Sequence, residues 1–421
     1  MNKLNQLAAL LFLLLVSSAT FSQWVIITSG GTKDLKSISL YQTWGYAVGD
    51  SGIVRKTVNG GSIWSTSAIN TVTNLNKAET INTIEAYIAA NGGYIFKTTN
   101  GGTNWNAQTA GLPGYNYYDM DFINSTTGLV VGTDGIFSAT ANGGANWIQG
   151  QLNLITAPKL DYVSVDMIDN NISFIGSADT LIAGIHNSYI QRSTNNGVSY
   201  TNVYTLQSGQ ANPFVCIQFI NATTGFAITP HGYIIKTTNG GNSWSSFLMN
   251  MNVEDAFFVN SLTGYACGPS GGLKKTTNGG TSWLWQNSPT TGTLYGIACI
   301  DSASAISVGV DGLIVKTDNG GTYTSVNQYG NEIPSDYSLG QNYPNPFNPS
   351  TRISFNVPTA SKVKLTVYDI LGNQIKVLTD ELLSPGTYEA VFNASELPSG
   401  TYFYRLEAGS FTETKKMILI K

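Results

Sequence analysis

Aspartate beside glycine recurs in the sequence where two predicted strands turn back on each other. Asp50, Asp134 and Asp311 occur in the segments DSG, TDG and VDG, and Asp179 lies in a longer insertion between comparable strands. Two carboxylates on either side of a sugar ring could hydrolyse a glycosidic bond, one acting as the acid and the other as the base or nucleophile. Aspartate beside glycine is also ordinary turn chemistry, because its side chain hydrogen-bonds to the turn backbone. We favour the turn role and keep a secreted glycoside hydrolase with such a carboxylate pair as the alternative.

Metal, cofactor and nucleophile chemistry has little support in the sequence. His186 and His231 are the two histidines, far apart and without a carboxylate at ligand spacing. Cys216, Cys267 and Cys299 lie in apolar, strand-like segments without Cys-x-x-Cys spacing, as expected of small buried core residues. No phosphate loop, nucleophile motif or dinucleotide fingerprint occurs. We therefore predict no metal and no cofactor, and we favour a protein without catalysis.

Aromatic and polar residues in the variable turns are better candidates for binding than for catalysis. The connection QTAGLPGYNYYD (108–119) carries three tyrosines, and the turn PHG carries a histidine. Turns that vary from repeat to repeat are typical of a binding surface, whereas repeated turns are typical of a structural one. We predict the following binding residues: Asp50, Tyr115, Tyr117, Tyr118, Asp134, Asp179, His231 and Asp311.

One turn motif occurs seven times and defines the architecture that must position these residues. The copies are KTVNGGSIW (56–64), KTTNGGTNW (97–105), ATANGGANW (139–147), RSTNNGVSY (192–200), KTTNGGNSW (236–244), KTTNGGTSW (275–283) and KTDNGGTYT (316–324). They recur at steps of 41, 42, 53, 44, 39 and 41 residues, and this period suits four short antiparallel strands, the unit of a propeller blade. The sequence therefore predicts an all-β fold with a seven-bladed β-propeller.

The two ends of this array predict how the ring closes. The seventh copy has Thr324 where the others have an aromatic residue, and Trp24 begins an apolar segment before the first repeat. We expect residues 24–28 to supply the fourth strand of blade seven, which would remove an open sheet edge.

The repeated turn, called the box below, has a structural explanation without a ligand. Its Asn hydrogen-bonds to the turn, its glycines adopt positive φ, and its Trp packs between neighbouring sheets. A basic residue precedes the box in six copies, either as a cationic ring for an acidic partner or as a solvated strand end, which we favour. The six are Lys56, Lys97, Arg192, Lys236, Lys275 and Lys316. The turns of the opposite face vary, and we expect any site there, around the channel mouth.

The box pattern Thr-x-Asn-x-Gly-x-x-Trp resembles the Asp-box turn of sialidases and related propellers, with Asn in place of Asp. The fuller repeat, with a Gly-aromatic-Ala-Val-Gly strand before the box hairpin, resembles the photosystem II assembly and stability factor family of seven-bladed propellers. That resemblance implies a scaffold that holds another protein. The sequence argues against sialidase activity. A sialidase needs three arginines to bind the substrate carboxylate, and residues 23–328 contain only Arg55 and Arg192.

The sequence after the last repeat has short alternating strands joined by Pro-Gly, Ser-Gly and Gly-Asn turns, which predicts a small Ig-like β-sandwich. It closely resembles the C-terminal sorting domain of type IX secretion substrates. The matching motifs are YPNPFNP (343–349), VYD (367–369), PGTY (385–388), SGTY (399–402) and KKM (415–417). The resemblance implies the type IX secretion machinery as a partner of residues 338–421.

The first residues predict a cleavable secretory signal. Lys3, an apolar run over residues 7–16 and small residues before Gln23 have the layout of such a signal, and the run is too short to span a membrane. We predict the following domains: a signal peptide at 1–22, the propeller at 23–328, a linker at 329–337 and the sorting domain at 338–421. The product would be secreted or displayed on the outer-membrane surface, by way of the periplasm.

The net charge of -4 includes no long run of one sign and therefore no basic stripe for phosphates. We predict no nucleic-acid partner and no membrane span. The favoured function is a protein- or glycan-binding scaffold whose extracellular ligand is unknown.

Overall fold

The computed structural model describes residues 24–108, 113–151, 160–178, 180–182, 184–195, 197–320, 326–328, 334–383, 385–394 and 397–421. This part of the chain is all-β, as predicted, and contains no helix that is long and apolar enough to cross a membrane. Contacts divide the chain into two compact units, one of Gln23–Thr322 and one that contains Tyr323–Lys421. The signal peptide predicted for residues 1–22 lies outside the described residues.

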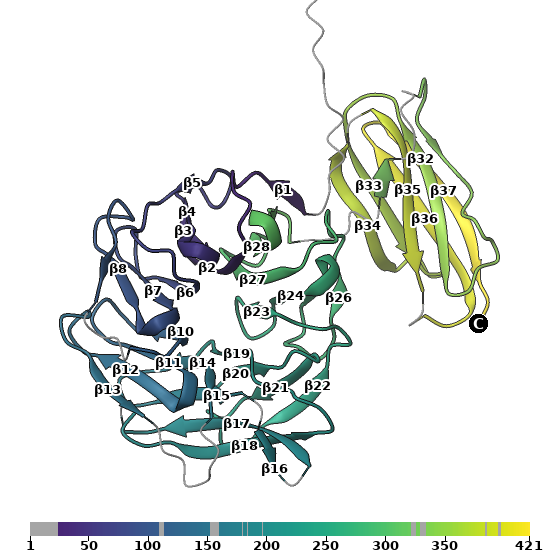
Figure 1. Cartoon of the computed structure of the whole chain (residues 1–421). Coiled ribbons are helices and arrows are strands. Elements are labelled where there is room, and N and C mark those ends of the chain that lie inside the picture. The colour runs from purple at the N-terminus through teal and green to yellow at the C-terminus, as the bar shows by residue number, and fades with distance from the viewer. Residues whose placement is uncertain are drawn as a thin grey trace, which may run out of the picture. The chain divides into compact units, whose positions relative to one another are not determined.

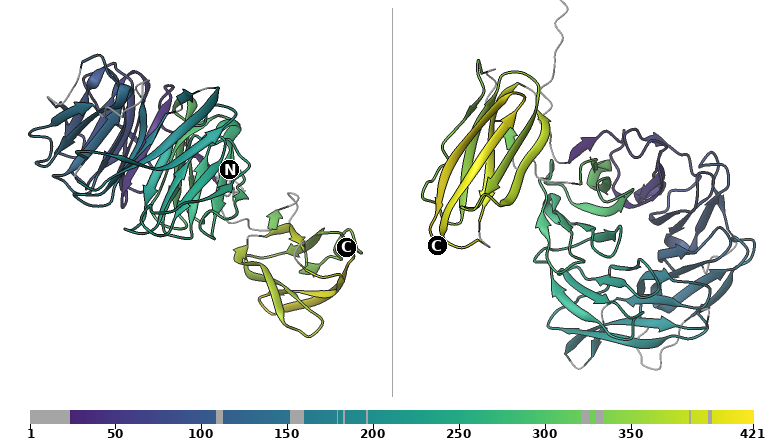
Figure 2. Two further views of the ribbon diagram at one scale, coloured as in Figure 1. Left: turned by 90° about the horizontal axis from the view of Figure 1, so that it is seen from below. Right: turned by 180° about the vertical axis from the view of Figure 1, so that it is seen from behind.

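Seven antiparallel sheets of the first unit stand around a central axis as the blades of a propeller (Figure 1), and Figure 2 shows the same ring from two further sides. From the axis outward, blade one has β2 (Leu35–Tyr41), β3 (Trp44–Gly49), β4 (Val54–Thr57) and β5 (Ser65–Thr66). Blade two has β6 (Leu75–Thr80), β7 (Ala86–Ala90), β8 (Ile95–Thr98) and β9 (Asn106–Ala107). Blade three has β10 (Tyr117–Phe122), β11 (Gly128–Gly132), β12 (Ile136–Thr140) and β13 (Ile148–Gln151).

Blade four carries the one enlarged hairpin that the sequence predicts. It has β14 (Tyr162–Met167), β15 (Ser173–Ser177), β17 (Ile185–Ser193) and β18 (Thr201–Ser208), and β16 (Thr180–Ile182) pairs with the start of β17. Blade five has β19 (Cys216–Phe219), β20 (Gly225–Ile228), β21 (Tyr233–Thr237) and β22 (Ser245–Leu248). Blade six has β23 (Asp255–Phe258), β24 (Gly264–Cys267), β25 (Leu273–Thr276) and β26 (Leu284–Trp285).

Blade seven closes the ring in the way that the two ends of the array predict. It has β27 (Leu294–Cys299), β28 (Ala305–Gly309) and β29 (Ile314–Thr317), and its outermost strand is β1 (Val25–Ile27). β1 runs antiparallel to β29, with Val25 opposite Lys316. Trp24 is fully buried and meets the ring of Tyr265 edge-on, with centroids 6.1 Å apart. The predicted closure by residues 24–28 is therefore confirmed for strand pairing.

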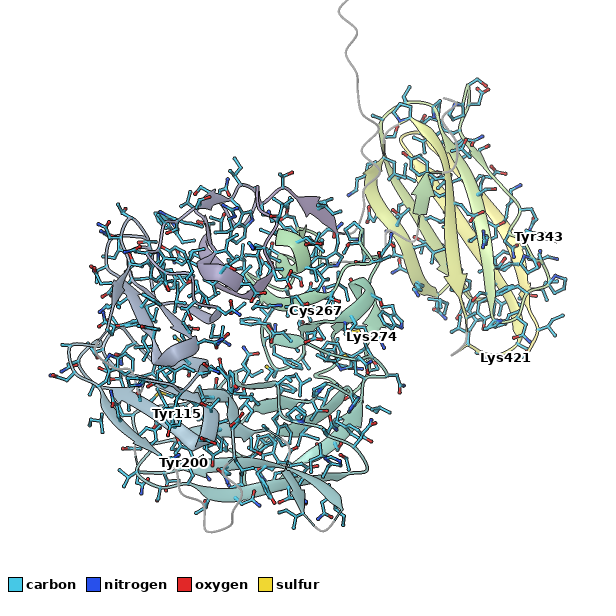
Figure 3. All side chains as sticks on the ribbon, in the orientation of Figure 1. Tyr115, Tyr200, Cys267, Lys274, Tyr343 and Lys421 are labelled. Carbon is cyan, nitrogen blue, oxygen red and sulfur yellow. The ribbon has the colours of Figure 1, made fainter. Side chains whose placement is uncertain are left out.

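The second strand of each blade is enclosed by its neighbours, which explains its small and apolar sequence. In β7 (AYIAA) and β11 (GLVVG) every residue is buried. Gly128 of β11 leaves room for a neighbouring ring, because a Cβ at this position would lie 2.4 Å from the ring of Phe122. Cys267 of β24 is buried in the same way (Figure 3), and so is Cys299 of β27, as predicted for core cysteines. Cys216 of β19 is only half-buried, so the prediction of a buried core residue is wrong for this cysteine.

The turns between strands two and three are single 3₁₀ turns in five blades: η1 (Asp50–Gly52), η2 (Asn91–Gly93), η3 (Thr133–Gly135), η4 (Pro269–Gly271) and η5 (Val310–Gly312). The middle residue of each has positive φ, for example 54° at Asp134 and 52° at Asp311. Short polar residues and glycine tolerate this backbone best, which accounts for the sequences of these turns.

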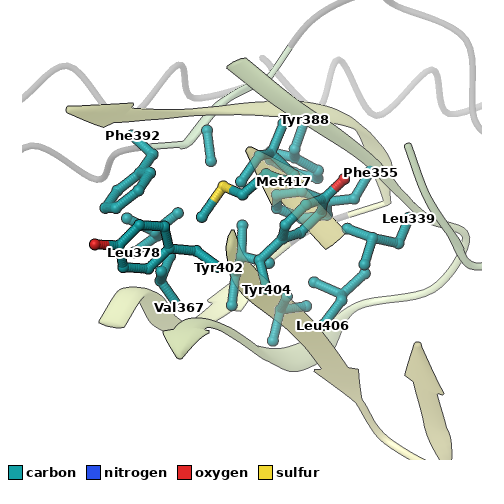
Figure 4. Packing of buried hydrophobic residues seen from close by; sticks show 14 of the residues in the cluster. Leu339, Phe355, Val367, Leu378, Tyr388, Phe392, Tyr402, Tyr404, Leu406 and Met417 are labelled. Atoms are coloured by element: carbon teal, nitrogen blue, oxygen red, sulfur yellow. The ribbon is translucent and has the colours of Figure 1, made fainter. Parts of the chain in front are cut away.

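The second unit is a sandwich of two four-stranded sheets, as predicted. One sheet has β30 (Val326–Gln328), β35 (Gly386–Asn393), β32 (Ser350–Val357) and β31 (Ser338–Leu339). The other has β34 (Gln374–Leu383), β33 (Ser361–Tyr368), β36 (Gly400–Ala408) and β37 (Phe411–Leu419). Aromatic residues and Met417 from the two sheets pack into one core (Figure 4).

The position of β30 corrects the end that we predicted for the propeller. We placed residues 326–328 in the propeller, but β30 pairs with β35 of the sandwich, with Val326 opposite Ala390. This pairing covers an edge of β35 that would otherwise be open. The sequence of residues 326–328 contains nothing that distinguishes this use from a last propeller strand.

Candidate functional site

The first strands of all seven blades line a cavity of about 290 Å³ on the axis of the propeller. Alternate residues of these strands face the cavity, because side chains of a strand alternate between its two sides. The cavity brings together charged residues of blades two, three, four and six: Lys77, Glu79, Asp121, Asp166 and Asp255.

Most of these acids have a structural use. The inner edge of each first strand has no neighbouring strand. In blades two, four, five, six and seven, side chains of the preceding blade accept hydrogen bonds from the N–H groups of this edge. Asp121 accepts from the N–H of Met167 at 2.6 Å, and Asp166 accepts from that of Phe219 at 3.1 Å. The same contact recurs at five more places. The accepting side chain and the donating N–H are those of Ser39 and Thr80 (2.8 Å), Asp119 and Val165 (2.8 Å), Ser164 and Ile217 (2.6 Å), Gln218 and Phe258 (2.7 Å), and Asp255 and Ile297 (3.0 Å). We call these contacts the inner latches.

The axial cavity, called the channel below, contains one lysine and four acidic residues, so the lysine does not balance the negative charge that the acids can carry. Lys77 forms an ion pair with Asp119, with 2.8 Å between Nζ and Oδ1. Burial opposes the charge of Lys77, but the attraction of Asp119 and then of Asp255 outweighs it, so that the pKa of Lys77 is raised. Asp119 therefore contacts both Nζ of Lys77, through Oδ1, and the N–H of Val165, through Oδ2.

The remaining carboxyl groups of the channel hold their protons more tightly than usual. Burial, and then repulsion by Asp121, raises the pKa of Glu79 to about 8. Burial likewise raises the pKa of Asp121 to about 6 and that of Asp255 to about 6, and it raises the pKa of Asp166 above its ordinary value. Raised pKa values of clustered carboxyl groups are typical of catalytic sites but also follow from crowding alone.

The acids predicted from the turns lie on separate blades of the variable face, the face of the strand two-to-three turns. Asp50 begins η1, with its Oδ2 3.8 Å from Nζ of Lys36. The N–H of Asp134 donates to Asp161 at 2.8 Å, and the N–H of Asp311 donates to Asp34 at 3.0 Å. No hydrogen bond or ion pair joins Asp50, Asp134 and Asp311 to one another within the described residues. Asp179 lies outside the described residues.

The predicted tyrosines and histidine differ in their exposure. Tyr117 is fully buried, with its hydroxyl hydrogen-bonded to Ser138, so our prediction that it contacts a ligand is wrong. As the first residue of β10 it points into the blade, whereas its neighbour Tyr118 is half-buried. Tyr115 packs at the edge of the core of blades two and three (Figure 3). His231 is half-buried, and its Nε2 lies 3.1 Å from the carbonyl oxygen of Ala211.

The boxes of the opposite face are held by their own hydrogen bonds. In blade two the N–H of Gly102 donates to Thr98 Oγ1 at 2.8 Å, and the N–H of Asn104 donates to Asn100 Oδ1 at 3.0 Å. Equivalent pairs of contacts occur in blades one, three, four, five and six. The polar groups of the box are thus used inside the turn.

In five of the six blades that have a basic residue before the box, this residue contacts the following blade, and it is not the solvated strand end that we expected. Lys97 Nζ donates to the carbonyl of Gly143 at 2.7 Å, and Lys275 Nζ donates to that of Gly320 at 2.7 Å. The others of this set are Lys236 to Gly279 (3.0 Å), Arg192 to Asn242 (3.2 Å) and Lys316 to Ser62 (3.0 Å). Lys56 lies over the ring of Trp44, 4.8 Å from its centroid. We call these residues the outer clamps.

Blade three lacks an outer clamp, and a small cavity lies in its place. Ala139 stands where the other blades have Lys or Arg, and Leu129 stands where most have an aromatic ring. A cavity of about 50 Å³ between blades three and four is lined by Leu129, Ala139, Ile148, Met167 and Gly197 among others. The cavity marks the space that the missing cation would fill.

Sequence reasoning missed the channel residues Lys77, Glu79, Asp119, Asp121 and Asp166. The signal was present, because charged or hydroxyl residues alternate with apolar ones in the segments LNKAET, YYDMDF and YVSVDM. These segments lie more than 40 residues apart, and only ring closure brings them to one axis.

Two family models match the chain. Residues 341–421 match the model of the secretion system C-terminal sorting domain, and residues 113–248 match that of the photosynthesis system II assembly factor YCF48. No curated protein matches the chain in sequence.

Solved structures of propellers resemble the chain in fold. YCF48 from Cyanidioschyzon merolae matches with 19% identity and a TM-score of 0.54, over 70% of this chain and 98% of its own. A structure of YCF48 bound to D1 peptide matches with 15% identity and a TM-score of 0.55, over 70% of this chain and 95% of its own. PorZ, a surface component of the type IX secretion system of Porphyromonas gingivalis, matches with 13% identity and a TM-score of 0.53, over 92% of this chain and 60% of its own.

The fold and these matches define the class of protein: a seven-bladed β-propeller that is exported by means of a C-terminal sorting domain. In particular, its propeller resembles the photosystem II assembly factor family, and its last domain is a type IX secretion sorting domain. The sorting domain directs the protein to the cell surface or to the extracellular space.

Proposed function

We propose that the propeller binds a protein or glycan outside the cell without catalysis, and that its variable face makes the contact. The difference between the two faces supports this proposal. On the box face, the Thr and Asn side chains and the outer clamps are used in contacts within the ring, such as Lys97 to Gly143. The variable face carries a different set of side chains in each blade, as a binding surface requires.

The solved structure of YCF48 with a D1 peptide supports binding as the activity of such a propeller. It concerns another protein at 15% identity, so we transfer from it only the general use of the scaffold. The surface role stated for PorZ agrees with a binding scaffold that works outside the cell.

A glycoside hydrolase that uses channel carboxylates is the second candidate. It is favoured by the raised pKa values of Glu79 and Asp121, which would keep one carboxyl protonated as an acid. The inner latches oppose it, because Asp121 and Asp166 accept backbone hydrogen bonds that a catalytic role would disturb. We therefore place binding first.

Matched charge variants on the two faces test the proposal. The full chain is screened against a glycan panel and cell-surface fractions, and hydrolysis is measured in parallel. The double variant Asp134→Asn with Asp311→Asn alters the variable face, and Asp169→Asn with Asp301→Asn makes the same charge change on the box face. Asn already occupies the latter position in other blades, for example Asn221, where it caps the same turn.

We expect saturable binding that is weakened several-fold by the variable-face pair and unchanged by the box-face pair. Equal effects of both pairs would argue against the variable face as the contact surface. Product release that disappears in Asp121→Asn would instead establish the hydrolase.

A further inference from the structure

A cavity of about 550 Å³ opens between blades four and five. Its lining comes from the end of β18 and the following loop (Gln207–Gln210), from Asn212, and from His231 and Tyr233 of blade five. The lining offers amides, a hydroxyl, an imidazole and one phenol ring, and none of its described residues is a carboxylate, lysine or arginine. Such a surface suits an uncharged ligand with many hydroxyl groups.

Asn212 is the most informative residue of this lining. It is 1% exposed, and neither its Oδ1 nor its Nδ2 has a hydrogen-bond partner in the described chain. Its backbone is fixed, because Ser188 Oγ donates to its carbonyl oxygen at 2.8 Å. A buried amide with neither its donor nor its acceptor used is strongly unfavourable. Both amide atoms are covered in this structure, so a ligand in the cavity reaches them once the Asn212 side chain turns toward it. A ligand that presents a donor and an acceptor side by side would then satisfy both atoms.

The walls around Asn212 are held in place before any ligand arrives. The ring of His231 contacts the carbonyl oxygen of Ala211 at 3.1 Å and fixes the loop on one side. Gln207 Nε2 donates to Asn187 Oδ1 at 3.2 Å and ties the end of β18 to the enlarged hairpin of blade four. Fixed walls reduce the entropy that binding must overcome.

Tyr233 supplies an apolar surface beside these polar groups. It begins β21, opposite Leu248, and is 36% exposed. An aromatic ring next to amides can stack against the C–H face of a sugar while the amides hydrogen-bond to its hydroxyls. A polypeptide is less suited, because only Gln207 and Ser208 of the lining lie in the outermost strand of a sheet, too few for strand addition.

We propose that the cavity between blades four and five binds a neutral carbohydrate, with a pair of adjacent hydroxyls on Asn212 and a ring face on Tyr233. This inference rests on the proposed binding function and names the ligand class for one site on the propeller. Because the amide of Asn212 uses a donor and an acceptor together, sugars without an adjacent hydroxyl pair should bind much more weakly.

The test uses the full chain and an array of neutral oligosaccharides that end in glucose, galactose, mannose or N-acetylglucosamine, with sialylated and sulfated versions of the same sugars. Affinity for the best neutral sugar is then measured by calorimetry. Asn212→Asp keeps the shape but removes the donor, and Tyr233→Ala removes the ring. Tyr94→Ala is the matched control, because Tyr94 is the exposed residue at the same position of blade two.

We expect saturable binding of a neutral sugar that weakens at least tenfold in Asn212→Asp and in Tyr233→Ala but not in Tyr94→Ala. If Asn212→Asp does not fold, Tyr233→Ala and Gln210→Ala, which alter exposed side chains, decide the question. Preference for charged sugars, or sugar binding that neither variant weakens, would overturn the inference. Binding of a protein but of no neutral sugar would leave the proposed function intact and refute this site, whereas the absence of all binding would refute both.

Discussion

Lys316 of blade seven donates from Nζ to Ser62 Oγ of blade one at 3.0 Å, across 254 positions of the sequence. The contact takes the place of the outer clamps inside the ring, such as Lys275 to Gly320, although its acceptor is a serine hydroxyl instead of a backbone carbonyl. The closing junction is therefore held like an ordinary junction between blades, with β1 completing the last sheet. The repeated lysines stabilise a ring and leave little free charge to recruit an acidic partner.

Removal of an outer clamp should destabilise the propeller. Lys275→Met keeps the apolar stem but leaves the carbonyl of Gly320 without its cation, and we expect a loss of about 1–3 kcal/mol in the free energy of unfolding. Tryptophan fluorescence in urea reports on this unit alone, since all eight tryptophans lie between positions 24 and 285. Lys33→Met, at an exposed position, is the control and should change stability by less than about 0.5 kcal/mol.

Addition of the missing clamp should have the opposite effect. Ala139→Lys places a cation in the cavity of about 50 Å³ between blades three and four, and filling a cavity of this kind typically adds about 0.5–2 kcal/mol. The melting temperature of the propeller should rise, whereas Ala107→Lys on the exposed strand β9 should leave it unchanged. A lower melting temperature for Ala139→Lys would mean that the cavity does not accept the clamp geometry of the other blades.

Because the channel carboxyl groups have raised pKa values, we predict that the propeller is less stable at alkaline pH. The pKa of Glu79 is raised to about 8, so its stabilising protonated form is fully present below about pH 4 and is lost as the pH rises through 8. Asp121 and Asp255, with pKa values near 6, add a loss between about pH 4 and 6. Urea midpoints measured from pH 5 to pH 9 should therefore fall.

Glu79→Gln isolates the largest of these contributions. The variant should match the wild type near pH 5 and exceed it by about 1–2 kcal/mol at pH 9, less than the full shift implies because the channel gives Glu79 partial contact with water. Glu85→Gln, on the same blade but outside the channel, should leave the pH dependence unchanged. A Glu79→Gln profile parallel to that of the wild type would show that Glu79 does not carry the effect.

The repeats allowed the blades to be predicted from the sequence, and the two ends of the repeat array allowed the closure at Trp24 to be predicted. The sandwich was predictable from its own turns and strand alternation, which are local features of the sequence. The channel group of Lys77, Glu79 and Asp166 was not predictable in the same way, since their neighbours come from other blades and are fixed only by closure of the ring. Tyr117 was misjudged because its neighbours in a turn-rich connection suggested exposure, whereas β10 begins with it and points it inward. The pairing of residues 326–328 with β35 likewise depends on a free strand edge that the sequence does not reveal.

The sorting domain offers a test that separates its fold from its recognition. Phe347 of the YPNPFNP segment is 2% exposed, packs near Phe392 with ring centroids 6.0 Å apart, and exchanges backbone hydrogen bonds with Ile418 and Ile420. Phe347→Ala should destabilise the sandwich by about 3–5 kcal/mol and abolish export through misfolding. Tyr343, in the same segment, is 80% exposed, so Tyr343→Ala should leave the fold intact.

We expect Tyr343→Ala to reduce export if the secretion machinery reads the surface of this segment. Export is measured as the fraction of the protein in the medium and on intact cells, and the fold is followed by the thermal melt of the purified chain. Tyr94→Ala, which removes an exposed tyrosine from the propeller, is the control and should be exported normally. Normal export of a folded Tyr343→Ala protein would show that the exposed ring of this motif is not part of the recognised surface, and would turn attention to the exposed strand positions of β37, such as Lys416.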